Sequence, residues 1–69
     1  MTPTEFYKIN SKQRITEVCT AAGTTFGNFQ QIAIAKGSVS SRLAKRLEEA
    51  SNGEMTLIEI LFPNETKAA

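Results

Sequence analysis

The stretch NSKQRITEVCTAAGTTFGNFQQIAIA, residues 10–35, decides the fold of this 69-residue chain. It contains two sets of apolar residues spaced three and four positions apart, as on one face of a helix. The first set is Ile15, Val18, Cys19 and Ala22, and the second set is Phe29, Ile32 and Ala33. Between them stands Gly23, a residue type that ends helices because it tolerates left-handed backbone geometry. The stretch therefore predicts two short helices around a tight turn at residues 22–25.

The chain begins with a strong signal for a helix. Thr2 and Glu5 match a capping box, and Pro3 suits the first helical position. A first helix should run to about Ile9, with Phe6 and Ile9 facing inward.

Caps also mark the two helices of the central stretch. Asn10 is expected to cap the first of them, and Thr24 or Thr25 the second. The order Lys36-Gly37 is typical of a helix end, so the second of them should close there.

Two further helices complete the predicted fold. One runs from about 41 to 51 with an apolar stripe of Leu43, Leu47 and Ala50, and Asn52-Gly53 ends it. The other spans about 56–61, where the run LIEILF also suits a strand. We expect an all-α fold, a compact bundle of about five short helices that contains a helix-turn-helix. Residues 1–63 form its one domain, and residues 64–69 form a flexible tail.

The second helix of the central stretch has the properties of a helix that contacts base edges. Its start is made of small or hydrogen-bonding residues, which allow a close approach to DNA, and a glutamine amide can form two bonds to adenine. The candidates for DNA contact are Thr24, Thr25, Phe26, Gly27, Asn28, Gln30 and Gln31. Two plainer alternatives stay open: the glutamines can be ordinary solvated surface, and Phe26 can be partly buried against the preceding helix.

A second group of residues suits DNA backbone phosphates. Hydroxyls at helix starts and basic side chains bind phosphate and set the position of the protein on the duplex. The candidates are Ser11, Arg14, Lys36, Ser40 and Arg42, although each can equally lie on a solvated face. Residues 1–46 carry a charge balance of +5 and residues 47–69 one of −4, so the basic part could orient the molecule toward a polyanion.

Composition argues against catalysis and metal binding. The chain has no His and no Asp, which removes the usual general base and most metal sites. We expect neither an enzyme nor a metal, cofactor or small-molecule substrate. The one cysteine, Cys19, should be a small buried residue, and a single cysteine suits a reducing cytoplasm. No apolar run is long enough to cross a membrane.

The order of these residues resembles the helix-turn-helix of phage Cro and repressor proteins. The matching pattern is Val18-Cys19-x-x-Ala22-Gly23-Thr24-Thr25-x-x-x-Phe29-x-Gln31-Ile32. The later pattern Arg42-Leu43-Ala44-x-x-Leu47-Glu48-x-Ala50-x-x-Gly53-x-x-Thr56, with Leu61-x-Pro63, is similar to the YdaS-like branch of the Cro superfamily. Together the two patterns cover roughly residues 3–63.

The resemblance implies an all-α domain, DNA binding and often dimerisation. It places Thr25, Phe26, Gly27 and Gln31 where base contacts are usually made. Three departures stand out: Cys19 replaces an alanine, Ile15 stands where related repressors often carry a polar phosphate contact, and the end of the chain is more apolar.

These observations predict a Cro-like transcription regulator, of phage or prophage origin, that binds operator DNA. Helix 24–35 would enter the major groove, and two copies would bind double-stranded DNA as a homodimer. An apolar patch is the expected dimer interface: Leu57, Ile58, Leu61 and Phe62. Two alternatives remain, an antitoxin-like or anti-repressor module whose target is a protein, and an architectural DNA binder with little sequence preference.

Overall fold

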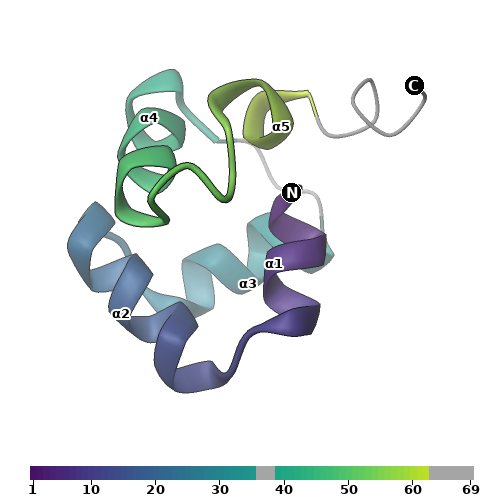
Figure 1. Cartoon of the computed structure of the whole chain (residues 1–69), viewed down its shortest axis with the longest axis vertical. Helices are drawn as coiled ribbons and strands as arrows, with labels where there is room; N and C mark the ends of the chain where they lie inside the picture. The colour runs from purple at the N-terminus through teal and green to yellow at the C-terminus, as the bar shows by residue number, and fades with distance from the viewer. Residues whose placement is uncertain (36–38, 63–69) are drawn as a thin grey trace.

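Five helices make up the structure, a computed structural model that describes residues 1–35 and 39–62 (Figure 1). They are α1 (Pro3–Ile9), α2 (Lys12–Ala22), α3 (Phe26–Ile34), α4 (Ser41–Ala50) and α5 (Leu57–Leu61). The described residues contain no strand, which confirms the all-α prediction and settles residues 57–61 as helix. The predicted tail at 64–69 and the expected helix end at Lys36-Gly37 lie outside the described residues.

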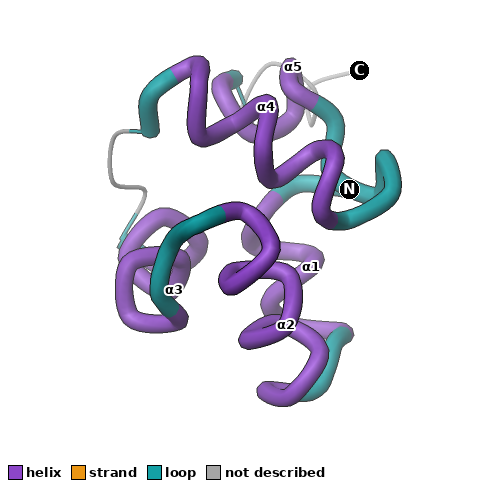
Figure 2. The backbone as a smooth tube through the Cα atoms, turned by 90° about the vertical axis from the view of Figure 1, so that its left-hand side faces the viewer, coloured by secondary structure: helices purple, strands orange, loops and turns teal. Residues whose placement is uncertain are grey.

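Four of the helices pack as two pairs that contact one another. α2 packs against α4, α1 packs against α3, and α5 covers the side of α4. α2 and α3 are consecutive and also touch one another, so α2 contacts both pairs. Figure 2 shows the result: α4 lies above the unit made by α2, the turn and α3, with that turn on the side toward the viewer.

Side-chain caps start every helix. Thr2 and Thr56 form complete capping boxes with Glu5 and Glu59, as the sequence predicts. The prediction that Asn10 caps α2 is wrong, because the N-cap is Ser11, whose hydroxyl oxygen accepts from the Arg14 N–H at 3.2 Å. Asn10 instead ends α1, where its side-chain amide donates to the carbonyl of Phe6 at 3.0 Å.

Left-handed residues end the helices where the chain reverses. Gly23 has φ +80° and ends α2, as predicted, and its N–H donates to the carbonyl of Thr20 at 3.1 Å. After α4, Asn52 (φ 55°) and Gly53 (φ 81°) both adopt this conformation. An asparagine or a glycine tolerates such a φ at little cost.

One continuous core joins all five helices. It contains six of the seven predicted apolar residues of α2 and α3, together with Phe6, Ala44, Leu47, Met55 and Ile60. The seventh, Ile32, is buried at 8% exposure but lies outside this cluster. The rings of Phe6 and Phe29 meet edge to face at 6.2 Å between centroids, which fastens α1 to α3. Of the predicted α4 stripe, Leu47 is fully buried, whereas Leu43 and Ala50 are only partly covered.

The prediction that Ile9 of α1 faces inward is wrong. Its side chain is 68% exposed, although the three-residue spacing from Phe6 suggested an inward position. The buried residues of α1 are Pro3 and Phe6, at i and i+3, and Ile9 lies off that face at the end of the helix.

Two ion pairs fix the loop before α5 and the start of the chain. Arg14 of α2 pairs with Glu54 at 2.6 Å between Nη2 and Oε2. The ammonium group of Met1 donates to Glu59 Oε1 at 2.8 Å and also to the carbonyl of Glu54. The bond from this ammonium, followed by the bond from the Thr56 N–H, lowers the pKa of the Glu59 carboxyl.

Leu47→Ala should destabilise the fold strongly, because Leu47 is fully buried in the core and the truncation leaves a cavity there. We expect the free energy of unfolding in urea to fall by about 2–5 kcal/mol. Ile9→Ala is the control, since that side chain is 68% exposed, and its effect should stay within about 0.5 kcal/mol. Equal losses in the two variants would contradict this account of the core.

Glu59→Gln should alter the acid sensitivity of the fold. Because the folded-state pKa is lowered, the carboxylate stabilises fully above its unfolded pKa, and this contribution disappears as pH falls through the lowered folded-state pKa. We therefore expect the thermal midpoint of Glu59→Gln to lie below that of wild type at pH 6, with the gap shrinking toward pH 3. Glu17→Gln, on the exposed side of α2, is the control. A gap that is constant with pH would disprove the linkage.

Candidate nucleic-acid interface

The exposed face of α3 is a continuous stripe. Gly27, Asn28, Gln31 and Ile34 stand at i, i+1, i+4 and i+7, and all are exposed. The opposite face holds Phe29, Ile32 and Ala33, which are buried. α3 is thus held firmly by its apolar face, and it presents a small residue, two amides and an aliphatic side chain to solvent. At Gly27 an added Cβ would meet no atom within 4 Å, so the space there is open.

Hydrogen bonds fix the start of α3. Thr25 is the N-cap, and its hydroxyl oxygen accepts from the N–H of Asn28 at 3.1 Å. The Asn28 amide donates to the hydroxyl of Thr24 at 2.8 Å. Thr24, Thr25 and Asn28 are therefore held in one arrangement before any ligand arrives, which lowers the entropy cost of binding.

Phe26 and Gln30 lie on a different side of α3, against α1. The ring of Phe26 is 6.0 Å from that of Tyr7, and Lys12 Nζ lies 5.4 Å from the Phe26 centroid. Gln30 donates from Nε2 to the Tyr7 hydroxyl at 3.2 Å. Both residues are partly buried. The two glutamines predicted to contact DNA therefore differ in availability. Gln31 is exposed, whereas the Gln30 amide already has a hydrogen-bond partner within the protein.

The predicted phosphate contacts likewise include residues that are exposed and one that already has a partner within the protein. Ser11 and Ser40 are exposed N-caps of α2 and α4, and Arg42 is exposed in the first turn of α4. Arg14 is different, because its guanidinium is paired with Glu54 and lies 5.6 Å from the centroid of Phe6. Lys36 lies outside the described residues.

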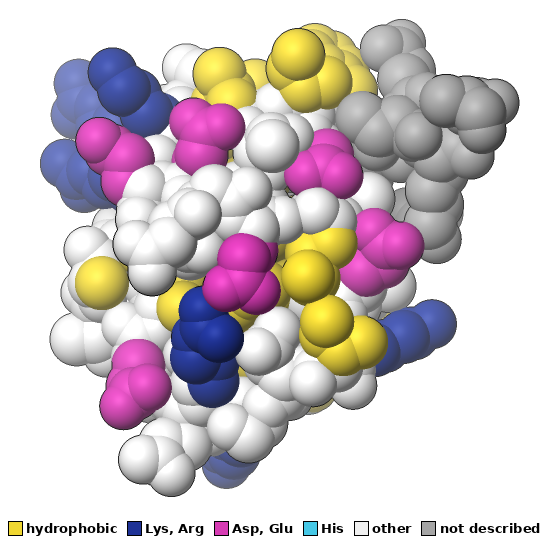
Figure 3. All heavy atoms as spheres, viewed as in Figure 1, with side chains coloured by type: hydrophobic (Ala, Val, Ile, Leu, Met, Phe, Trp, Pro, Cys, Tyr) yellow, Lys and Arg dark blue, Asp and Glu magenta, His cyan; other side chains and the backbone are white. Residues whose placement is uncertain are grey.

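Sequence reasoning gave Arg42 as a phosphate contact but left two further cations of α4 out of the candidate site. Arg42, Lys45 and Arg46 are all exposed, and Figure 3 shows basic side chains gathered over α4 at the upper left. Arg46 Nη1 lies 3.6 Å from the position that a Cβ on Gly23 would occupy, so the guanidinium lies against the turn that precedes α3. The signal in the sequence was the spacing of three cations at i, i+3 and i+4; their position relative to the turn required the structure.

The four residues expected at a dimer interface do not form one exposed patch. Ile58 and Phe62 are 61% and 52% exposed, but Leu57 and Leu61 are partly buried against the core of the same molecule. The N–H of Leu57 also donates to Glu48 Oε2 at 3.0 Å, which ties α5 to α4. Figure 3 shows the hydrophobic surface that remains over α5.

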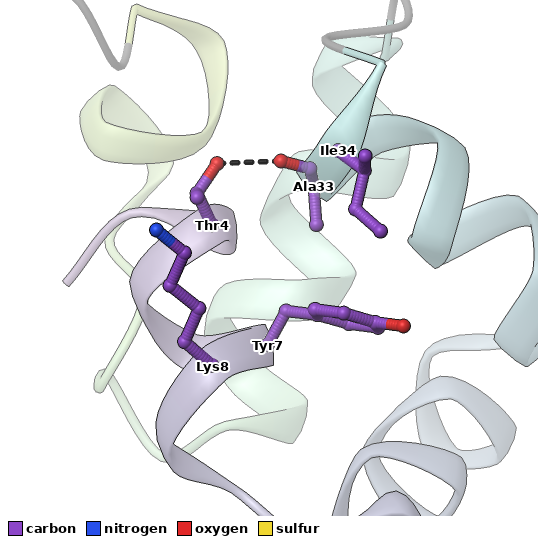
Figure 4. Close-up of a pocket in the computed structure, with 5 residues that line it drawn as sticks. All are labelled: Thr4, Tyr7, Lys8, Ala33 and Ile34. Atoms are coloured by element: carbon purple, nitrogen blue, oxygen red, sulfur yellow. Dashed lines mark hydrogen bonds between the residues drawn. The ribbon is translucent and has the colours of Figure 1, made fainter.

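A pocket of 410 Å³ between α1 and α3 is lined by Thr4, Tyr7, Lys8, Ala33 and Ile34 (Figure 4). Only Lys8 is charged among them, and Thr4 donates to the Ala33 carbonyl at 2.6 Å. Burial raises the pKa of the Cys19 thiol. Within residues 1–35 and 39–62 no three metal-ligating side chains gather, and no helix could span a bilayer.

Comparison with known proteins gives no further assignment. The chain matches no protein family model, no curated protein sequence and no solved structure. The resemblance to Cro-type proteins therefore rests on the residues themselves, and DNA binding remains a prediction.

Thr25→Ala should weaken the start of α3. Loss of the cap leaves the Asn28 N–H without its acceptor, and we expect a loss of about 1 kcal/mol in the free energy of unfolding. Thr25→Ser keeps the hydroxyl and should restore most of that stability. Urea unfolding of both variants tests this, and equal losses would show that the cap bond is unimportant.

Proposed function

We propose that this chain is a sequence-specific DNA-binding regulator of transcription that inserts α3 into the major groove. The observation that carries the proposal is the exposed stripe of α3, held by a buried opposite face and following a glycine turn. A helix that contacts bases needs this combination of a rigid support and small or amide side chains at its exposed positions. Following its resemblance to phage Cro and repressor proteins, we place this regulator in the cytoplasm of a bacterial or phage-infected cell.

Gln31 is the residue to which we assign base contact. It lies in the middle of the stripe, and it is exposed, whereas the Gln30 amide is bound to Tyr7. A free glutamine amide can donate to and accept from adenine at once. Thr25, Gly27 and Asn28 surround it at the start of the helix, and Ser11, Ser40 and Arg42 supply phosphate contacts that set the register.

The protein acts as a dimer in this proposal. A two-fold pair of α3 helices would bind half-sites about 34 Å apart, one turn of the duplex. Exposed Ile58 and Phe62 on and after α5 are the surface for the second copy.

The same exposed residues support a second candidate, a module that binds another protein through α5, in the manner of an antitoxin or anti-repressor. The two candidates differ in salt dependence. DNA binding releases counterions and weakens steeply with salt, while an apolar contact does not.

The first experiment is selection of duplexes from a randomised pool, followed by fluorescence anisotropy on the enriched and random duplexes at 50 and 200 mM salt. Preference for the enriched duplex, with affinity falling steeply between the two salt concentrations, supports the regulator. Equal affinity for both duplexes supports an architectural binder. Absence of binding to either refutes DNA as the ligand.

Gln31→Ala should reduce discrimination between the enriched and the random duplex by about 1–3 kcal/mol, because the amide contact to one base pair is lost. Its thermal unfolding should be unchanged, since the side chain is exposed. Gln13→Ala, which removes an exposed glutamine from α2, is the matched control and should bind like wild type. Unchanged discrimination in Gln31→Ala would remove this residue from the contact surface.

A further inference from the structure

α4 carries three cations without an acidic partner. Arg42, Lys45 and Arg46 are neighbours on one face, and the two ion pairs found within residues 1–35 and 39–62 involve none of them. Like charges at this spacing disfavour a helix. The cluster therefore costs the isolated protein some stability, and an external anion would relieve that repulsion.

The nearby carboxylates do not neutralise the cluster. Glu48 accepts from the Leu57 N–H and so faces α5, away from the cationic face. Glu49 is exposed and stands three positions after Arg46 and four after Lys45, a spacing at which opposite charges attract. Within the described ranges, however, Glu49 makes no ion pair with either cation. The charge of the three cations is thus available to solvent.

The position of Arg46 connects this cluster to the start of α3. Its Nη1 atom lies 3.6 Å from the position of a Cβ on Gly23. Gly23 is followed directly by Thr24 and by Thr25, and Thr25 is the N-cap of α3. A duplex lying against the stripe of α3 would bring a backbone phosphate near this turn, and the planar guanidinium of arginine suits phosphate oxygens.

We propose that α4 binds the phosphate backbone of the same DNA duplex, with Arg46 as the residue that fixes α3 relative to the groove. This inference rests on the proposed function. Arg46 makes no base contact in this arrangement, so it contributes affinity and position but no sequence preference. Arg42 and Lys45 extend the positive surface along the helix.

The test compares Arg46→Gln with Lys8→Gln by anisotropy on the enriched and random duplexes between 50 and 200 mM salt. Lys8 is an exposed cation on α1, and in Figure 4 its side chain points away from Tyr7. Arg46→Gln should bind both duplexes more weakly by the same factor. The slope of its log affinity against log salt concentration should be shallower by the amount expected for about one phosphate contact. Between 50 and 200 mM salt, the factor by which its affinity falls should therefore be about 3.5 times smaller than the factor for wild type. Lys8→Gln should match wild type.

Arg46→Lys tests whether a positive charge at this position is sufficient for the phosphate contact. It keeps a phosphate-binding point charge and should retain the salt dependence of wild type, and thermal unfolding of each variant verifies the fold. If wild type binds DNA and Arg46→Gln binds with unchanged affinity and salt dependence, the role of α4 is overturned while the proposed function stands. If Arg46→Gln changes sequence discrimination, Arg46 is not a phosphate contact. If wild type binds no DNA, both proposals fail.

Discussion

The close packing of α2 against two other helices is the constraint on which the rest of this structure depends. α2 contacts α4 on one side and α3 on another, and its buried side chains are Ile15, Val18, Cys19 and Ala22. Ala33 and Ala44 face the same core and are also fully covered. Because small side chains let helix axes approach, larger residues at these positions would overpack the centre of the domain. The turn at Gly23 then has a fixed geometry, which orients α3.

Much of this architecture could be predicted from local chemistry. The spacing of Val18, Cys19 and Ala22, the glycine at the turn and the capping box at Thr56 each act over a few residues, so they are visible in the sequence. Asn10 was assigned wrongly because two residues that can cap a helix, Asn10 and Ser11, are adjacent in the sequence. Ile9 was assigned wrongly because the packing of α1 against the rest of the domain decides which residues face inward. Met55, in the loop before α5, is fully buried, and no short-range pattern in the sequence predicts this.

The candidate site was predictable in its position but not in the availability of each side chain. Sequence reasoning placed the polar residues at the start of α3, yet it could not separate Gln31 from Gln30, because the partner of Gln30 is Tyr7 of α1. Arg14 and Arg46 show the same limit. The guanidinium of Arg14 is paired with Glu54, forty residues further along the chain. The guanidinium of Arg46 instead lies at the turn before α3. Such pairings depend on tertiary structure, which brings distant segments together.

The burial of Cys19 has a practical consequence. It is the only cysteine of the chain, it is 1% exposed, and burial raises the pKa of its thiol. Because the thiolate is the reactive form, an alkylating reagent will modify this sulfur only when α2 separates from the core. The rate of alkylation of the unmodified protein therefore measures how often the domain opens, without any engineered probe.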